Sequence, residues 1–185
     1  EHGVTLGVVR ACRRVAPDLR VLHLDAHADL RSSFEGTPYS HACVIRRIVE
    51  DGVGVSSFGI RSLSREEAVF IETDPRAPAV RFAHRMAAGW EAAAAAAPPG
   101  GRYYITVDVD FFDPAAVPDT GTPEPGGFFW RETVDFLRAF IARPDVSVVG
   151  FDAVELAPRD HLSPSCFLVA RLLHRMIGCL AARGG

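Results

Sequence analysis

Hydrophobic positions along the chain follow two spacings, one typical of strands and the other typical of helices. Short apolar runs predict strands, and apolar residues three or four positions apart predict helices. The predicted strands are 19–24, 53–60, 79–82, 102–109 and 146–151. The predicted helices are 4–15, 41–50, a segment beginning after Ser64, 84–97, 131–142 and 163–182. Glu67 follows Ser64 at the spacing of a capping box, which favours a helix start there.

The alternation of strands with helices predicts a parallel sheet covered by helices on both faces. We therefore expect an α/β fold, a three-layer α/β/α sandwich with a mainly parallel sheet, in a single domain over residues 1–185. A loop rich in proline and glycine occupies residues 110–127. Loops of this length are uncommon in compact domains unless they serve a function.

Composition narrows the possible partners. Apolar residues make up 48% of the chain and charged residues 23%, so a full hydrophobic core is expected. The net charge is −3, so nucleic acid and anionic membranes are not expected as partners. No apolar run approaches the ~20 residues of a membrane span. The chain has four widely spaced cysteines in mostly apolar surroundings: Cys12, Cys43, Cys166 and Cys179. This pattern predicts buried free thiols in a reducing compartment, and hence a cytoplasmic protein.

Acidic residues gather where predicted strands end. Asp25, His27 and Asp29 alternate after the first strand, so an extended chain would place them on one side. This spacing suits a divalent cation, but it is also compatible with an ordinary polar strand end. Asp108 and Asp110 repeat the pattern after another strand. Ligands in such sheets bind at these ends, and packed carboxylates repel one another unless cations neutralise them.

Several ordered motifs resemble those of the ureohydrolase family, which includes arginases and agmatinases. They are DAHAD at 25–29, TVDVDFFDP at 106–114, TGTPEPGG at 120–127, FDAVELAP at 151–158 and the initial Glu1-His2. The segment PYSHACVIRRI at 38–48 is closer to agmatinases than to arginases. The resemblance implies an arginase-like sandwich whose N-terminal strands are absent before Glu1.

The resemblance also implies two manganese ions (Mn²⁺) per subunit, bridged by two aspartates. One ion would be held by His2, Asp25, Asp29 and Asp108, and the other by His27, Asp25, Asp108 and Asp110. Oxygen-rich sites without thiolates favour manganese over structural zinc, although this argument leaves zinc open.

The implied reaction is attack on a guanidinium carbon by a hydroxide that bridges the two ions, giving urea and a primary amine. His41 would return a proton to the amine, Glu155 would hold the guanidinium, and Thr122 would steady Glu155. Asp29 counts as catalytic as well as metal-binding. Without the resemblance, His41 is equally an ordinary helix-start residue and Thr122 a turn residue. The remaining histidines, which match no motif, are interpreted as structural or surface residues: His23, His84, His161 and His174.

We therefore expect hydrolysis of a small guanidino compound, most of all agmatine to putrescine and urea. The alternatives are another guanidino substrate (a guanidino-polyamine, guanidinobutyrate or arginine) or a truncated, non-catalytic metal-binding subunit. The resemblance implies a homo-oligomer, a trimer or hexamer. If the chain truly begins at Glu1, we expect low stability alone or reliance on neighbouring subunits. We also expect a His2 that lies on a loose terminus and binds metal weakly.

Overall fold

Five parallel strands form one sheet in the computed structural model, which describes residues 1–86, 90–160 and 162–183. The strands are β1 (Arg20–Leu24), β2 (Gly54–Ile60), β3 (Ala79–Phe82), β4 (Gly101–Asp108) and β5 (Val146–Val154). Their order in the sheet is β3-β2-β1-β4-β5. Neighbouring strands pair in parallel throughout, so their carboxyl ends all meet at one edge of the sheet.

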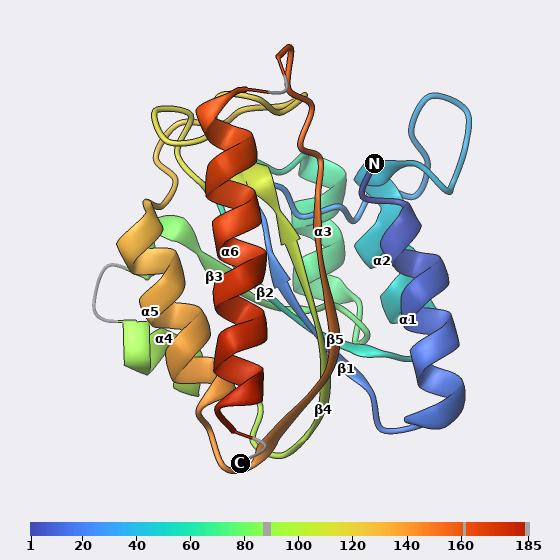
Figure 1. The fold of residues 1–185 in the computed structure, drawn as a ribbon. Coiled ribbons are helices and arrows are strands. Elements are labelled where there is room, and N and C mark those ends of the chain that lie inside the picture. The colour runs from blue at the N-terminus through green and yellow to red at the C-terminus, as the bar shows by residue number, and fades with distance from the viewer. Residues whose placement is uncertain (87–89, 161, 184–185) are drawn as a thin grey trace.

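Helices cover both faces of this sheet. They are α1 (Val4–Val15), α2 (Val44–Glu50), α3 (Arg65–Thr73), α4 (Trp90–Ala95), α5 (Trp130–Ile141) and α6 (Pro164–Ala181). Figure 1 shows α1, α2 and α3 on one side of the sheet and α4, α5 and α6 on the other. Each side has its own apolar core, because alternate residues of a strand face opposite layers: Tyr104 packs with the first set and Tyr103 with the second. The three-layer sandwich is therefore confirmed.

The predicted elements agree closely with the observed ones. Residues 4–15 and 79–82 have the expected bounds, and Ser64 and Glu67 form the expected capping box. The predicted helix 41–50 divides into a 3-10 turn, His41–Cys43, followed by α2. The predicted helix 84–97 divides into a 3-10 turn, Ala83–Arg85, and α4, and residues 87–89 between them lie outside the described residues. The last strand runs beyond the predicted 151 because β5 pairs with β4 as far as Asp108.

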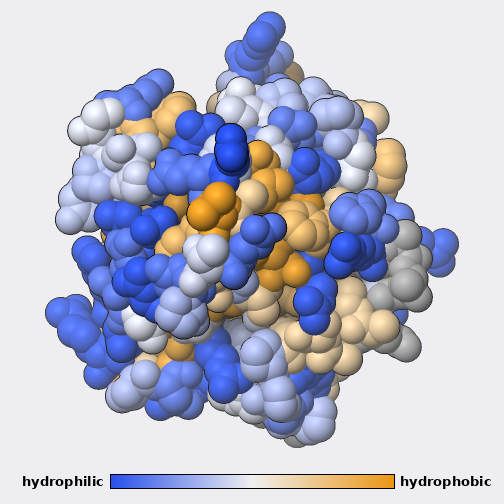
Figure 2. All heavy atoms as spheres, turned by 180° about the vertical axis from the view of Figure 1, so that it is seen from behind, coloured by the Kyte–Doolittle hydropathy of each residue, from blue (hydrophilic) through white to orange (hydrophobic). Residues whose placement is uncertain are grey.

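The surface is mostly hydrophilic, and Figure 2 shows apolar residues gathered near the middle of the face opposite to the view of Figure 1. Within the described residues, α6 is the one helix whose length and composition would allow it to cross a membrane. This is weak evidence of a span, since core helices of globular proteins pass the same test. The four cysteines are free thiols, as expected, but the expectation that all are buried is wrong, because only Cys43 is buried and the other three are partly exposed.

Candidate metal centre

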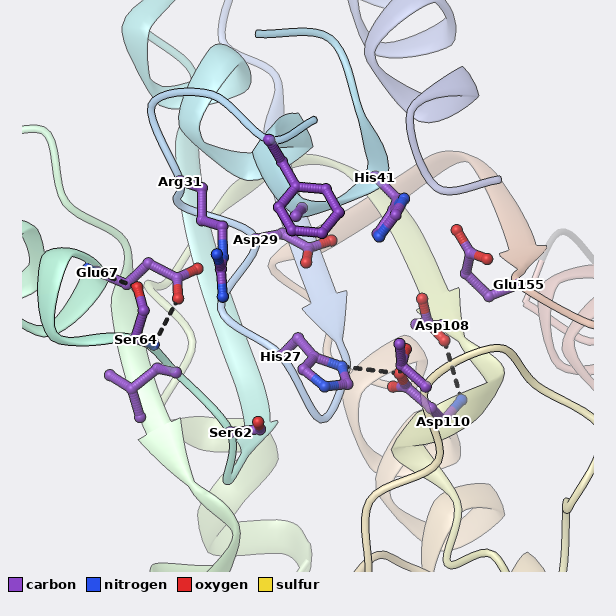
Figure 3. Close-up of a pocket in the computed structure, with 14 residues that line it drawn as sticks. His27, Asp29, Arg31, His41, Ser62, Ser64, Glu67, Asp108, Asp110 and Glu155 are labelled. Atoms are coloured by element: carbon purple, nitrogen blue, oxygen red, sulfur yellow. Dashed lines mark hydrogen bonds and ion pairs between the residues drawn. The ribbon is translucent and has the colours of Figure 1, made fainter. Parts of the chain in front are cut away.

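The topology of the sheet brings the acidic motifs together. Strands β1 and β4 are neighbours, with Leu24 paired to Val107, so the residues that follow β1 lie beside the end of β4. Strand β5 lies on the other side of β4, where Asp108 pairs with Val154, the residue before Glu155. Three strand ends therefore meet at one point on the carboxyl edge, and Figure 3 shows Asp108, Asp110 and Glu155 around the same pocket.

His2 lies at the centre of a first group of ligand atoms. Its imidazole is fully buried, and its Nε2 is 3.0 Å from the hydroxyl of Thr106. Its Nδ1 faces a carboxylate oxygen of each of three aspartates: Asp25 at 3.2 Å, Asp29 at 3.1 Å and Asp108 at 3.3 Å. None of these contacts has hydrogen-bond geometry, so Nδ1 is a buried polar atom without a hydrogen-bond partner. Such an atom ringed by carboxylates is what a cation site requires.

A second group of ligand atoms surrounds His27. Its Nδ1 lies 2.9 Å from Asp110 Oδ2 and 3.7 Å from Asp25 Oδ1. The other oxygen of Asp110 accepts a hydrogen bond from the backbone amide of Ala26 at 3.0 Å. Asp25 offers Oδ1 to this group and Oδ2 to the His2 group, so it lies where a bridging ligand is expected.

The pKa values of these side chains reflect packed like charges. Burial and the charge of Asp25 raise the pKa of Asp29 to about 7, and the same two causes raise the pKa of Asp108 well above its ordinary value. Burial alone would lower the pKa of His27, but Asp110 and Asp25 raise it to about 11. Without cations, the site therefore holds protons among its carboxylates. Two divalent ions would neutralise the same charges, so the donor set fits a two-metal centre.

The alternation expected for Asp25, His27 and Asp29 is wrong in its geometry, although the three side chains do converge. β1 ends at Leu24, and Asp29 has a left-handed backbone conformation with φ of 52°. The chain therefore turns at Asp29 instead of continuing as a strand, and the turn aims its carboxylate at His2. Glu155 also has a positive φ, of 63°. Left-handed non-glycine residues are costly and gather at functional sites, which agrees with the position of both.

A pocket of about 270 Å³ opens over the two groups. Its walls include His41 and Glu155, with Phe34 packed edge-on against the His41 ring at a centroid distance of 5.4 Å. Glu155 Oε1 accepts a hydrogen bond of 2.6 Å from the backbone amide of His2. That bond and the full burial of His2 show that the expectation of a loosely held His2 is wrong.

Thr122 also lines the pocket, but its hydroxyl donates to Asp110 Oδ2 at 3.4 Å. Among the described residues, the structure shows no bond between Thr122 and Glu155. The expectation that Thr122 steadies Glu155 is therefore not met, and Thr122 instead contacts Asp110 of the His27 group.

Sequence reasoning missed the contribution of His23. Its imidazole is fully buried, with Nε2 2.8 Å from Asp25 Oδ2 and Nδ1 3.0 Å from Ser57 Oγ. It therefore orients Asp25 in the centre of the site. The signal was present, since His23 lies two residues before Asp25 at the end of the strand. His84 and His174 are exposed as expected, and His161 lies outside the described residues.

Comparison with known proteins shows similarity to the members of one family. The family model for the arginase family matches residues 1–178. An N(1)-aminopropylagmatine ureohydrolase from Synechocystis sp. is 39% identical over 96% of this chain and 58% of its own length. An agmatinase from Halalkalibacterium halodurans is 38% identical over 85% of this chain and 54% of its own length.

A solved structure of the agmatine ureohydrolase of Thermoplasma volcanium superposes with a TM-score of 0.85 and 35% identity, over 98% of this chain and 60% of that protein. The chain thus spans a little over half the length of the relatives that it matches.

Proposed function

Because this chain belongs to the arginase family, we propose that it hydrolyses the guanidino group of a small linear substrate, releasing urea and a primary amine. One observation carries the proposal. The His2 and His27 groups share Asp25 at the base of a pocket that also presents His41 and Glu155. Candidate metal ligands, an imidazole and a carboxylate thus meet around a space of substrate size.

The donor set supports two divalent ions, with manganese as the expected metal. Four carboxylates and two imidazoles offer oxygen and nitrogen ligands and no thiolate, as manganese prefers. Ions bound there would lower the pKa of water so that hydroxide is available near neutral pH.

The protein's own residues position and complete the reaction. Glu155, fixed by the His2 amide, would accept hydrogen bonds from the guanidinium and keep its carbon over the two groups. His41 stands on the same side of the pocket as Glu155 in Figure 3, with its ring partly open to solvent. In this proposal it would give a proton to the departing amine and recover one from water.

Agmatine is the substrate that we favour, and N(1)-aminopropylagmatine is the second candidate. The names of the relatives support these two, and the carboxylate of Glu155 in the pocket wall, which is not a candidate metal ligand, suits a cationic guanidinium. Guanidinobutyrate and arginine complete the set of substrates to compare. A homo-oligomer, trimer or hexamer, forms part of the same proposal and is measured by sedimentation velocity.

The test is urea release by the purified protein after loading with Mn²⁺. We expect turnover of agmatine or N(1)-aminopropylagmatine by the native chain, and loss of both activity and bound metal in Asp108→Asn, which removes a carboxylate that faces His2. Two bound ions with no urea from any of the four substrates would instead favour a non-catalytic metal-binding subunit. A chain that binds no metal would refute the proposal.

A further inference from the structure

Arg61, directly after β2, makes an unusual set of hydrogen bonds. Within the part of the chain that the structure describes, its half-buried guanidinium donates only to backbone carbonyl oxygens. Nε donates to Pro125 at 3.1 Å, Nη1 to Gly59 at 3.2 Å, and Nη2 to Asp110 at 2.7 Å, Glu124 at 2.8 Å and Phe112 at 3.3 Å. A guanidinium has five N–H donors in a fixed plane, so a lysine could not make this set of bonds.

These five carbonyls belong to three separate segments of the chain. One is the end of β2, the second is the turn after β4 that carries Asp110, and the third is the loop that follows Thr122. Arg61 thus fastens the long proline- and glycine-rich loop to the carboxyl edge of the sheet. Gly127 permits the approach, since a Cβ there would lie 2.6 Å from Arg61 Nη2.

The bond to Asp110 connects this clamp to the metal centre. Arg61 fixes the carbonyl of Asp110, while the carboxylate of the same residue contacts His27 and the amide of Ala26. The His2 group is anchored differently, through Thr106 and Glu155, and none of its described hydrogen bonds involves Arg61. Apart from the hydrogen bond that the Asp110 amide donates to Asp108 Oδ1, the two halves of the centre therefore have separate supports.

We propose that Arg61 is a positioning residue for the His27–Asp110 half of the metal centre, acting by holding the backbone of Asp110 and its loop against β2. Arg61 does not line the pocket and takes no part in the chemistry. The proposal rests on the two-metal centre of the proposed function. It predicts that loss of the clamp weakens the binding of one ion much more than that of the other.

Arg143 offers a matched control at the opposite edge of the sheet, just before β5. It also donates to three backbone carbonyls, those of Ala94, Ala97 and Pro98, and it pairs with Asp145. Replacing either arginine by lysine removes a carbonyl clamp while keeping the charge. Only the clamp made by Arg61 reaches a candidate metal ligand.

The experiment compares Arg61→Lys, Arg143→Lys and the native protein by calorimetric titration of the metal-free chains with Mn²⁺. We expect Arg61→Lys to raise the Kd of one ion about 10- to 100-fold, the range for loss of outer supports of metal ligands, and to raise the Kd of the other ion much less. Arg143→Lys should leave both Kd values unchanged, even if its melting temperature falls as far as that of Arg61→Lys. Equal weakening in the two variants, or none in Arg61→Lys, would overturn the proposal.

Hydrogen exchange gives a second readout that needs no metal. Arg61→Lys should speed exchange of the Asp110 and Gly127 amides, which bond to Asp108 and Asp113, and Arg143→Lys should not. Unchanged exchange at both amides would refute the clamp, whether or not the native chain binds Mn²⁺. Failure of the native chain to bind Mn²⁺ would refute the proposed function, which is a separate outcome. Arg61→Gln, which keeps a planar donor, takes the place of Arg61→Lys if the latter does not fold.

Discussion

Replacing Asp29 by asparagine in the metal-free protein would remove one buried carboxyl whose pKa is raised to about 7 by burial and by the charge of Asp25. Asparagine has nearly the same shape, and it tolerates the left-handed backbone at this position, where φ is 52°. The substitution therefore isolates the ionisation of Asp29 from its packing. The comparison of interest is the free energy of unfolding of the two metal-free chains between pH 5 and pH 8.

The sign follows from proton linkage. A carboxyl with a raised pKa binds its proton more tightly in the folded chain, so its contribution to stability is complete below the unfolded pKa and is lost as the pH rises through the folded one. A change from 3.8 to about 7 corresponds to on the order of 4 kcal/mol, at about 1.36 kcal/mol per pH unit. Between pH 5 and pH 8, the part that is lost is about 2–3 kcal/mol.

Denaturant unfolding in the presence of a chelator measures this difference. We expect the native chain to lose about 2–3 kcal/mol relative to Asp29→Asn as the pH rises from 5 to 8. With saturating Mn²⁺ at pH 8, the native chain should be more stable than Asp29→Asn, because a bound cation favours the ionised carboxylate. Parallel pH profiles for the two metal-free chains would refute the claim that Asp29 holds a proton near neutrality.

Three further substitutions test other parts of the structure. His41→Ala should keep both metal ions and lose most urea release; loss of metal, as measured by elemental analysis, would contradict its placement as a proton donor. His23→Gln should weaken Mn²⁺ binding about 10-fold or more in a calorimetric titration, because it disturbs the side chain that orients Asp25, and unchanged affinity would show that the contact is dispensable. Gly59→Ala should destabilise the fold by about 3 kcal/mol in thermal unfolding. The φ of Gly59 is 92°, and a Cβ there would lie 2.4 Å from the ring of Phe111. The control, Gly7→Ala in open space on α1, should have no such effect.

The sequence determined most of the secondary structure and the residue types that gather at the candidate site. Local periodicity is enough to place α1 and β3, because each depends on residues close in the chain. The capping box of α3 was equally readable, since Ser64 and Glu67 contact each other across a single turn. The acidic strand ends pointed to a cation site for the same reason, as each motif is continuous in sequence.

Only the tertiary structure decided which of these local features meet. The order β3-β2-β1-β4-β5 places Asp25 beside Asp108, and no spacing in the sequence specifies that order. The contact of His2 with Thr106 joins residues more than one hundred positions apart. The clamp of Arg61 is also invisible in sequence, because its acceptors are backbone carbonyls, which every residue carries. Contacts of this kind depend on where the chain passes, and that is fixed by packing the sheet between its two helical layers.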